Sequence, residues 1–130
     1  MGANDILGSN IRSTGTFKNV PSATLARINE IKVTRWRGGQ HPTLEAISQK
    51  MQQEGLRPYA SSNGPNTRIA ARSHGYSKVL YCVAGSVDLF FPDVNQTLAL
   101  RPGDRVELPL GLRHATIVGP QGAQCLECAK

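Results

Sequence analysis

The sequence predicts an all-β domain. Its 130 residues include 13 glycines and 8 prolines, and only one segment has a convincing helical pattern. From residue 67 onward, short apolar and β-branched runs alternate with turns rich in Gly, Pro, Asn or Asp. A chain of this length suits one domain and buries a sizeable core without metal or disulfide staples. Many short strands at such spacing predict a sandwich or barrel.

We expect two regions along the chain. Residues 1–30 are predicted to form an N-terminal arm, partly irregular, because their apolar residues are too scattered for a strand or a helix. At most one short turn is expected there, over residues 24–29. Residues 31–130 are predicted to form a single barrel domain, whose first strand covers the alternating segment 31–36.

Residues 42–54 form the one predicted helix. It opens on Pro42 and closes on Gly55, and it carries Leu44, Ile47 and Met51 on one face. A helix with one apolar stripe is expected to cover a sheet. Residues 59–66 are predicted to be a loop, and the rest of the chain is predicted to form strands at residues 67–74, 78–84, 87–91, 97–100, 105–108, 115–118 and 123–129.

Charge and cysteine content exclude several classes of protein. The net charge is +6, but the basic residues are spread out and no aromatic ladder accompanies them, so we expect no nucleic-acid partner. No long apolar run or apolar leader is present, so a soluble cytoplasmic protein with reduced thiols is expected, with no membrane partner. Cys125 and Cys128 lie at an odd offset in one predicted strand, so one thiol is expected to be buried and the other exposed.

The segment from Gly103 to His114 is the most informative motif. It has the spacing G-x5-P-x-G-x2-H, in which a turn at Gly103 precedes a short strand and a second tight turn, Pro109 to Gly111, delivers one histidine. A histidine held on rigid scaffold in this way is expected to face a pocket. The function then depends on which side chains share that pocket.

This segment resembles the second sequence motif of the cupins at every fixed position. The stretch from Arg72 to Lys78, followed by six residues to Gly85, is similar in spacing to their first motif, H-x-H-x3-E-x6-G. The resemblance implies a cupin double-stranded β-helix, a jelly-roll barrel, with one helix on its N-terminal side. It also implies that the barrel interior is the active or binding site.

The resemblance departs from the family at the metal ligands. Metal-binding cupins use three histidines and one glutamate, and the four matching positions here hold Arg72, His74, Lys78 and His114. Only two imidazoles remain, and arginine cannot act as a metal ligand because it keeps its proton. A degenerate metal site is therefore expected. The cofactor is either absent or one divalent transition metal on His74 and His114.

The replaced side chains suggest a basic, histidine-containing pocket. We expect Arg72, His74, Tyr76, Lys78 and His114 to bind a small polar or anionic molecule, with Arg72 as a bidentate donor and Lys78 as a point charge. Alternatively, a bulge or register slip turns Arg72 and Lys78 to the surface. A third interpretation is that Glu107 or Glu127 pairs with them as a structural ion pair.

Three functions follow from these alternatives. The first is a small-molecule-binding cupin that needs no metal, and the second is a metal-dependent enzyme of the dioxygenase or isomerase type using His74 and His114. The third is a dimerisation module with a vestigial pocket, and a homodimer is expected because cupins commonly pair through sheet faces or N-terminal strands. Whether the protein catalyses a reaction stays open, because the fold hosts many activities.

Overall fold

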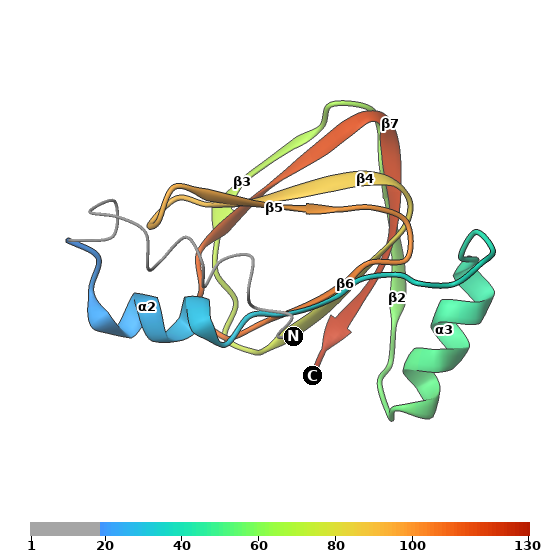
Figure 1. Ribbon diagram of the computed structural model, residues 1–130, viewed down its shortest axis with the longest axis horizontal. Helices are drawn as coiled ribbons and strands as arrows, with labels where there is room; N and C mark the ends of the chain where they lie inside the picture. Colours follow the sequence, from blue (N-terminus) through green and yellow to red (C-terminus); the bar gives the residue numbers. More distant parts are fainter. Residues whose placement is uncertain (1–18) are drawn as a thin grey trace.

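The computed structural model describes residues 19–130, and the first 18 residues of the expected arm lie outside them (Figure 1). Two helices and seven strands occur in this part of the chain. The helices are α2 (Ser22–Asn29) and α3 (Leu44–Gln53). The strands are β1 (Lys32–Thr34), β2 (Tyr59–Asn63), β3 (Arg68–Arg72), β4 (Lys78–Phe91), β5 (Gln96–Leu100), β6 (Arg105–Leu108) and β7 (His114–Ala129).

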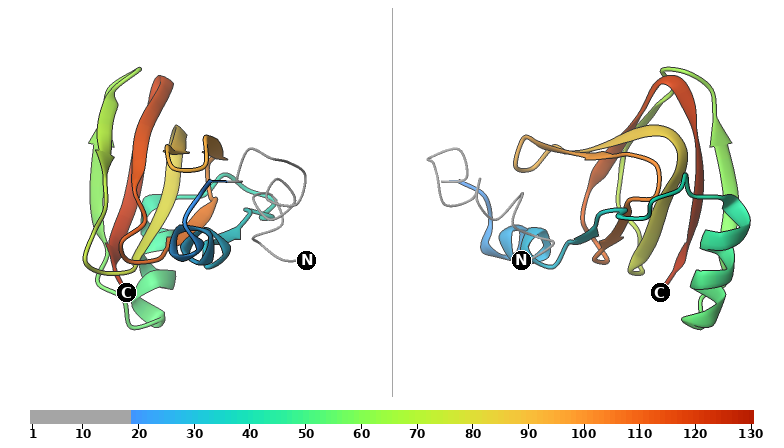
Figure 2. Two further views of the ribbon diagram at one scale, coloured as in Figure 1. Left: turned by 90° about the vertical axis from the view of Figure 1, so that its left-hand side faces the viewer. Right: turned by 45° about the vertical axis from the view of Figure 1, so that its right-hand side comes forward.

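The two long strands, β4 and β7, bend, so that one seven-stranded sheet folds into two facing parts, which we call the two sheets. The first half of β4 and the second half of β7 lie in the order β1-β6-β4-β7-β2. Their other halves pair with β5 and β3, which gives the order β5-β4-β7-β3. All pairs are antiparallel, and the strands bend between their halves so that the two sheets enclose the barrel (Figures 1 and 2).

Each long strand was predicted as two separate strands. The segments 78–84 and 87–91 join because register shifts in the β4–β7 pairing, between residues 82 and 84 and between residues 85 and 87, bend the strand without ending it. The segments 115–118 and 123–129 join in the same way across glycine-containing residues. Turn residues alone therefore do not distinguish a bend from a strand end.

The core has two parts, one inside the barrel and one under α3. The interior cluster contains residues from both sheets, and Ile28 of α2 and Ile31 also pack into it. The second cluster lies between the outer face of β4 and β7 and helix α3, where Ile47 and Met51 are buried. Residues 78–83 of β4 are therefore buried on both faces, because α3 covers the face that does not look into the barrel.

Helix α3 has well-formed ends. Thr43 accepts a hydrogen bond from the Ala46 amide at 3.1 Å and so caps the helix, which starts two residues later than predicted. At the other end Gly55 has φ +82°, and the amides of Gly55 and Leu56 donate to the carbonyls of Gln52 and Met51. This Schellman motif confirms the predicted helix end at Gly55.

The sequence interpretation missed two elements. Residues 22–29 form a helix of two turns where one short turn was expected; its Ile28 is 1% exposed because the helix packs against the barrel core. Residues 59–63 form edge strand β2 where a loop was expected, because this polar segment pairs with β7 and has no apolar alternation of its own. Strand β1 covers only residues 32–34 of the predicted 31–36.

The Gly103–His114 motif forms the predicted turn–strand–turn. Gly103 has φ +92°, and a Cβ there would collide with the Trp36 ring. Gly111 has φ +79°, and its amide donates to the His74 carbonyl at 2.8 Å. The second turn therefore holds His74 in place as well as leading into β7, whose first residue is His114.

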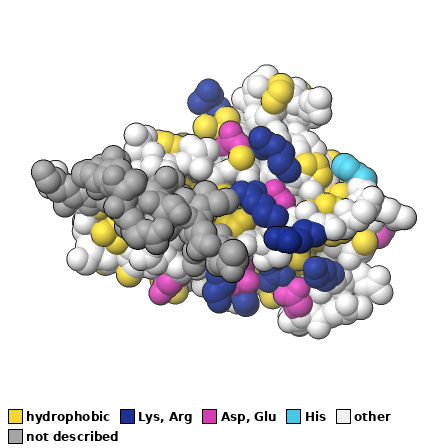
Figure 3. All heavy atoms as spheres, in the orientation of Figure 1, with side chains coloured by type: hydrophobic (Ala, Val, Ile, Leu, Met, Phe, Trp, Pro, Cys, Tyr) yellow, Lys and Arg dark blue, Asp and Glu magenta, His cyan; other side chains and the backbone are white. Residues whose placement is uncertain are grey.

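The surface carries mixed charge. On the face seen in Figure 3, Lys and Arg side chains lie interspersed with Asp and Glu side chains. Within residues 19–130, no helix is long and apolar enough to cross a membrane. The expectations of a cytoplasmic location and of no nucleic-acid partner stay predictions.

Candidate functional site

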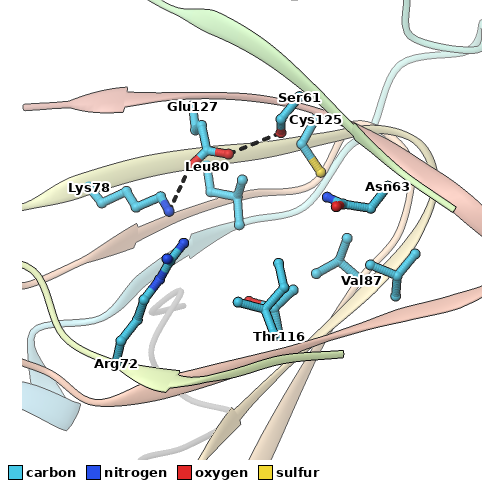
Figure 4. Close-up of a pocket in the computed structure, with 11 residues that line it drawn as sticks. Ser61, Asn63, Arg72, Lys78, Leu80, Val87, Thr116, Cys125 and Glu127 are labelled. Carbon is cyan, nitrogen blue, oxygen red and sulfur yellow. Dashed lines mark hydrogen bonds and ion pairs between the residues drawn. The ribbon is translucent and has the colours of Figure 1, made fainter. Parts of the chain in front are cut away.

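A cavity lies between the two sheets, inside the barrel (Figure 4). About 410 Å³ of space lies between the side chains, open solvent at the mouth included. Its walls combine apolar, hydroxyl, amide, thiol and charged side chains. The lining residues are Ser61, Asn63, Ile69, Arg72, Lys78, Leu80, Val87, Thr116, Val118, Cys125 and Glu127.

Lys78 and Glu127 form an ion pair in the cavity wall. Lys78 Nζ lies 2.6 Å from Glu127 Oε1, and the two side chains are only 11% and 14% exposed. The other carboxylate oxygen accepts a hydrogen bond from the Ser61 hydroxyl at 3.0 Å. Of the sequence alternatives, the structural ion pair is therefore present for Lys78, with Glu127 as its partner. Glu107 instead pairs with Arg105 and Lys130.

The surroundings of Glu127 keep its carboxylate charged. Burial acts to raise its pKa, but the hydrogen bond and charge of Lys78, with the hydroxyls of Ser61 and Tyr59, hold the pKa below its ordinary value. Both carboxylate oxygens are engaged by neighbouring donors. The Lys78 ammonium has three N–H donors, so two remain for other partners.

Arg72 reaches the cavity because of a bulge in β3. Ile69 pairs with Thr116 and Arg72 pairs with His114, so β3 has one extra residue between them. In a regular strand Ile69 and Arg72 would face opposite sides, but the extra residue places both on the cavity wall. The bulge therefore turns Arg72 toward the cavity. One alternative from the sequence was that a bulge would turn Arg72 to the surface, and that alternative is wrong for Arg72.

The guanidinium of Arg72 is available for a ligand. Figure 4 shows it pointing into the cavity, toward Lys78. Within the described part of the chain, the Arg72 side chain has no hydrogen bond and no ion pair, whereas Glu127 neutralises Lys78. The charged groups of the cavity wall thus leave one net positive charge, carried by Arg72.

The two histidines lie together beside the cavity. The ring centroids of His74 and His114 are 5.5 Å apart, and Tyr76 lies 5.1 Å from His74 on the other side. His114 is 5% exposed and its Nδ1 lies 3.0 Å from the Leu112 carbonyl, so Nδ1 carries the proton. None of these three rings lines the cavity, and Tyr76 is 40% exposed.

Both imidazoles have a pKa below the ordinary value, which favours their neutral form. Burial lowers the pKa of each ring below 6.5, and the positive charges of Lys78 and Arg72 lower it further. Two effects oppose this decrease: the Glu127 charge raises the pKa of His74, and the hydrogen bond to Leu112 raises the pKa of His114. Within residues 19–130, His74 Nε2 is the one buried side-chain nitrogen or oxygen without a hydrogen-bond partner.

The residues present do not fit the metal set that the cupin resemblance implies. Among the described residues, no group of three or more His, Cys, Asp or Glu side chains is placed to hold a metal ion. Two neutral imidazoles are available, but the other two expected positions carry Arg72 and Lys78. The nearby Glu127 carboxylate is already bound by Lys78 and Ser61. A divalent ion would thus lack ligands and lie beside a cation.

Several cavity residues were missed from the sequence. Ser61 and Asn63 lie on β2, which was taken for a loop, and no local signal identifies them. Thr116 and Val118 share the strand face of His114 at even offsets, so parity along β7 was a usable signal. Cys125 and Glu127 are also an even number of residues apart and so share one face of β7. The pairing of β7 with β4 is what places them near Lys78.

Comparison with known proteins gives a fold match. No protein-family model and no curated protein sequence matches the chain. Among solved structures, it is similar to a DUF861 family protein from Thermotoga maritima, with a TM-score of 0.52, 18% identity, and coverage of 78% of this chain and 100% of that one. A cupin superfamily protein from Desulfitobacterium hafniense has a TM-score of 0.49 and 13% identity, with 85% and 94% covered.

The chain has the cupin fold. An RmlC-like cupin from Shewanella frigidimarina is also similar, with a TM-score of 0.48, 18% identity, and 75% and 72% covered. The strands of this structure and its likeness to the DUF861 family protein confirm the predicted all-β jelly-roll barrel. At these identities the likeness extends to the fold alone, so ligand binding by the five predicted site residues, the cofactor, the homodimer and any catalysis stay predictions.

Proposed function

We propose that this cupin barrel binds a small organic carboxylate in its cavity without using a metal. The observation that carries the proposal is the unpaired Arg72 guanidinium, which points into a cavity whose other cation, Lys78, is already neutralised. A guanidinium offers two parallel N–H donors to a carboxylate, and this bidentate contact is among the stronger hydrogen-bonded pairs.

The charge of the cavity favours a monoanion. Arg72 supplies one net positive charge, and the two remaining Lys78 donors supply hydrogen bonds without further net charge. A phosphate dianion would bring a second negative charge close to Glu127, whose carboxylate stays ionised. The hydroxyls of Ser61 and Thr116 and the amide of Asn63 suit a polar remainder such as that of a hydroxy acid or sugar acid.

The first prediction is a selective loss of carboxylate binding on replacing Arg72. Thermal shift and calorimetry with lactate, glucuronate, benzoate and inorganic phosphate, at matched ionic strength, should show stabilisation by at least one carboxylate and less by phosphate. Arg72→Gln should weaken that binding by about 10-fold or more, since a hydrogen bond to a charged group contributes roughly 1.5–3 kcal/mol.

Arg68→Gln is the matched control. Arg68 lies on the same strand, carries the same charge and is exposed like Arg72, but it does not line the cavity. Its replacement should leave carboxylate affinity unchanged. Absence of stabilisation by every anion tested, or equal losses in the two variants, would contradict the proposal.

A further inference from the structure

Two of the three cysteines face each other inside the barrel. Cys82 on β4 pairs with Cys125 on β7, and both side chains belong to the interior core cluster. Cys128 lies in the other cluster, under α3. Cys125 and Cys128 are thus on opposite faces, as expected, but both are buried at 5% and 4% exposure, so the expected exposed thiol is wrong. Helix α3 covers Cys128, which strand parity alone does not indicate.

The backbone places the paired thiols close together. The Cys82 amide donates to the Asp104 carbonyl at 3.1 Å, and its own carbonyl accepts from the Gly103 amide at 2.7 Å. Both backbone groups therefore point away from β7, so Cys82 and Cys125 form a non-hydrogen-bonded pair. In such pairs the Cα atoms lie about 4.5 Å apart, within the range of roughly 4.4–6.8 Å that a disulfide spans.

The Cys82 thiol is held in the bent part of β4. Its Sγ donates to the carbonyls of Ala84 and Gly85, at 3.6 and 3.7 Å. The neighbouring Cys125 thiol lowers the pKa of Cys82, with burial opposing it, and the neighbouring Cys82 thiol together with burial raises the pKa of Cys125. A register shift between Cys82 and Ala84 interrupts the regular pairing of β4 with β7 at this point, so the backbone there is less constrained by the ladder.

A small oxidant can reach one member of the pair. Cys125 lines the cavity, whereas Cys82 is 0% exposed behind it. Figure 4 shows the Cys125 sulfur directed into the space between the strands. Cys128 does not line this cavity. The chain therefore holds two paired thiols, of which Cys125 lines the cavity, and a third thiol in the other core cluster.

We propose that Cys82 and Cys125 are a site of oxidative modification that hydrogen peroxide converts to a cross-strand disulfide. In the first step an S–O bond forms at Cys125, the O–O bond of peroxide breaks, and the thiol proton leaves with the second oxygen as water. In the second step the Cys82 sulfur attacks the Cys125 sulfur, the S–S bond forms and the S–O bond breaks, and a second water leaves. The two sulfurs lose two electrons and peroxide gains them.

Thiol counting on the unmodified chain tests this directly. The reduced protein in denaturant should react with three equivalents of maleimide, and protein first treated with hydrogen peroxide and desalted should react with one. The oxidised protein should be lighter by about 2 Da and recover its mass with dithiothreitol. Peptide mapping without reductant should join Cys82 to Cys125. The disulfide should also raise the Tm by several degrees, since it constrains the unfolded chain.

Variants separate the pair from the third thiol. Cys128→Ser should still form the disulfide, and Cys125→Ser should not. Three reactive thiols after peroxide treatment, or a disulfide that includes Cys128, would overturn the proposal. The thiol count of the unmodified chain keeps the test decisive if a variant fails to fold. The outcome does not depend on anion binding, because no step involves Arg72 or a carboxylate.

Discussion

Lys78 and Glu127 are opposite charges held inside the barrel. Removing two ions from water is costly, and their attraction repays that cost only when the geometry and the remaining hydrogen bonds are good. Here the ammonium and carboxylate are 2.6 Å apart and Ser61 satisfies the second oxygen. Each charge of the pair is therefore neutralised by the other, and removing one of the two side chains leaves an uncompensated buried charge.

At the residue scale we predict that replacing one member of this ion pair lowers the free energy of unfolding much more than replacing both. Lys78→Met should lower the free energy of unfolding by about 3 kcal/mol, because Glu127 then stays buried and unpaired. The double variant Lys78→Met, Glu127→Leu should recover most of that loss. Urea denaturation measures both. Lys130→Met is the control, since its ion pair with Glu107 is 46% exposed on the lysine side and should contribute less than about 1 kcal/mol.

The same pair should show a defined pH dependence. The folded-state pKa of Glu127 is lower than its ordinary 4.5, so its contribution is complete above about pH 4.5 and is lost as pH falls through the folded value. The stability difference between the unmodified protein and Glu127→Gln should therefore shrink in acid. A difference that stays constant from pH 7 to the acid limit would show that the charge of Glu127 contributes nothing.

At the scale of elements, helix α3 is held by two kinds of contact. Met51 is 0% exposed against the outer face of the sheet, and Ile47 packs beside it. Near the helix end, both carboxylate oxygens of Glu54 lie 2.9 Å from Arg105 Nη1. The Glu54 side chain is 37% exposed, so solvent screens this ion pair. The apolar contact is expected to dominate.

Substitutions on α3 test which contact holds the helix. Met51→Ala should lower the free energy of unfolding by about 3 kcal/mol, because it removes a fully buried side chain and leaves a cavity. Glu54→Gln should cost less than about 1 kcal/mol. Chemical denaturation of both variants decides the matter. If Glu54→Gln proved the more damaging change, the ion pair rather than apolar packing would fix the helix.

The sequence predicted some elements well because turn residues next to them in the chain determine where they begin and end. Strand β6 has the predicted bounds since turns containing Gly103 and Gly111 enclose it. Strand β2 was missed because its partner, β7, supplies the reason for its extended form. The cavity residues divide in the same way between local and long-range causes. The sequence motif predicted Arg72 and Lys78, whereas Glu127 and Ser61 reach the cavity only through the pairing of β7 with β4 and β2.

At the scale of the whole molecule, a cupin barrel encloses a cavity whose charge is built from side chains. Arg72 lies on the cavity wall and is not neutralised by any described residue. A divalent ion beside the Arg72 guanidinium would be repelled by its charge, and solvent weakens this repulsion because Arg72 is exposed. His74 and His114 alone offer two ligands, fewer than the three or four protein ligands usual in zinc sites.

We therefore predict that protein purified without a metal-affinity tag contains less than about one tenth of an equivalent of Mn, Fe, Co, Ni, Cu or Zn. Elemental analysis measures this directly. A triple variant, Arg72→His, Lys78→Glu and Glu127→Gln, should gain metal, because it places three histidines and one glutamate at the four motif positions. It also removes the Glu127 carboxylate, which would repel a second carboxylate beside it. A full equivalent in the unmodified protein would mean that two imidazoles suffice, and the metal-dependent enzyme hypothesis would then replace the metal-free pocket.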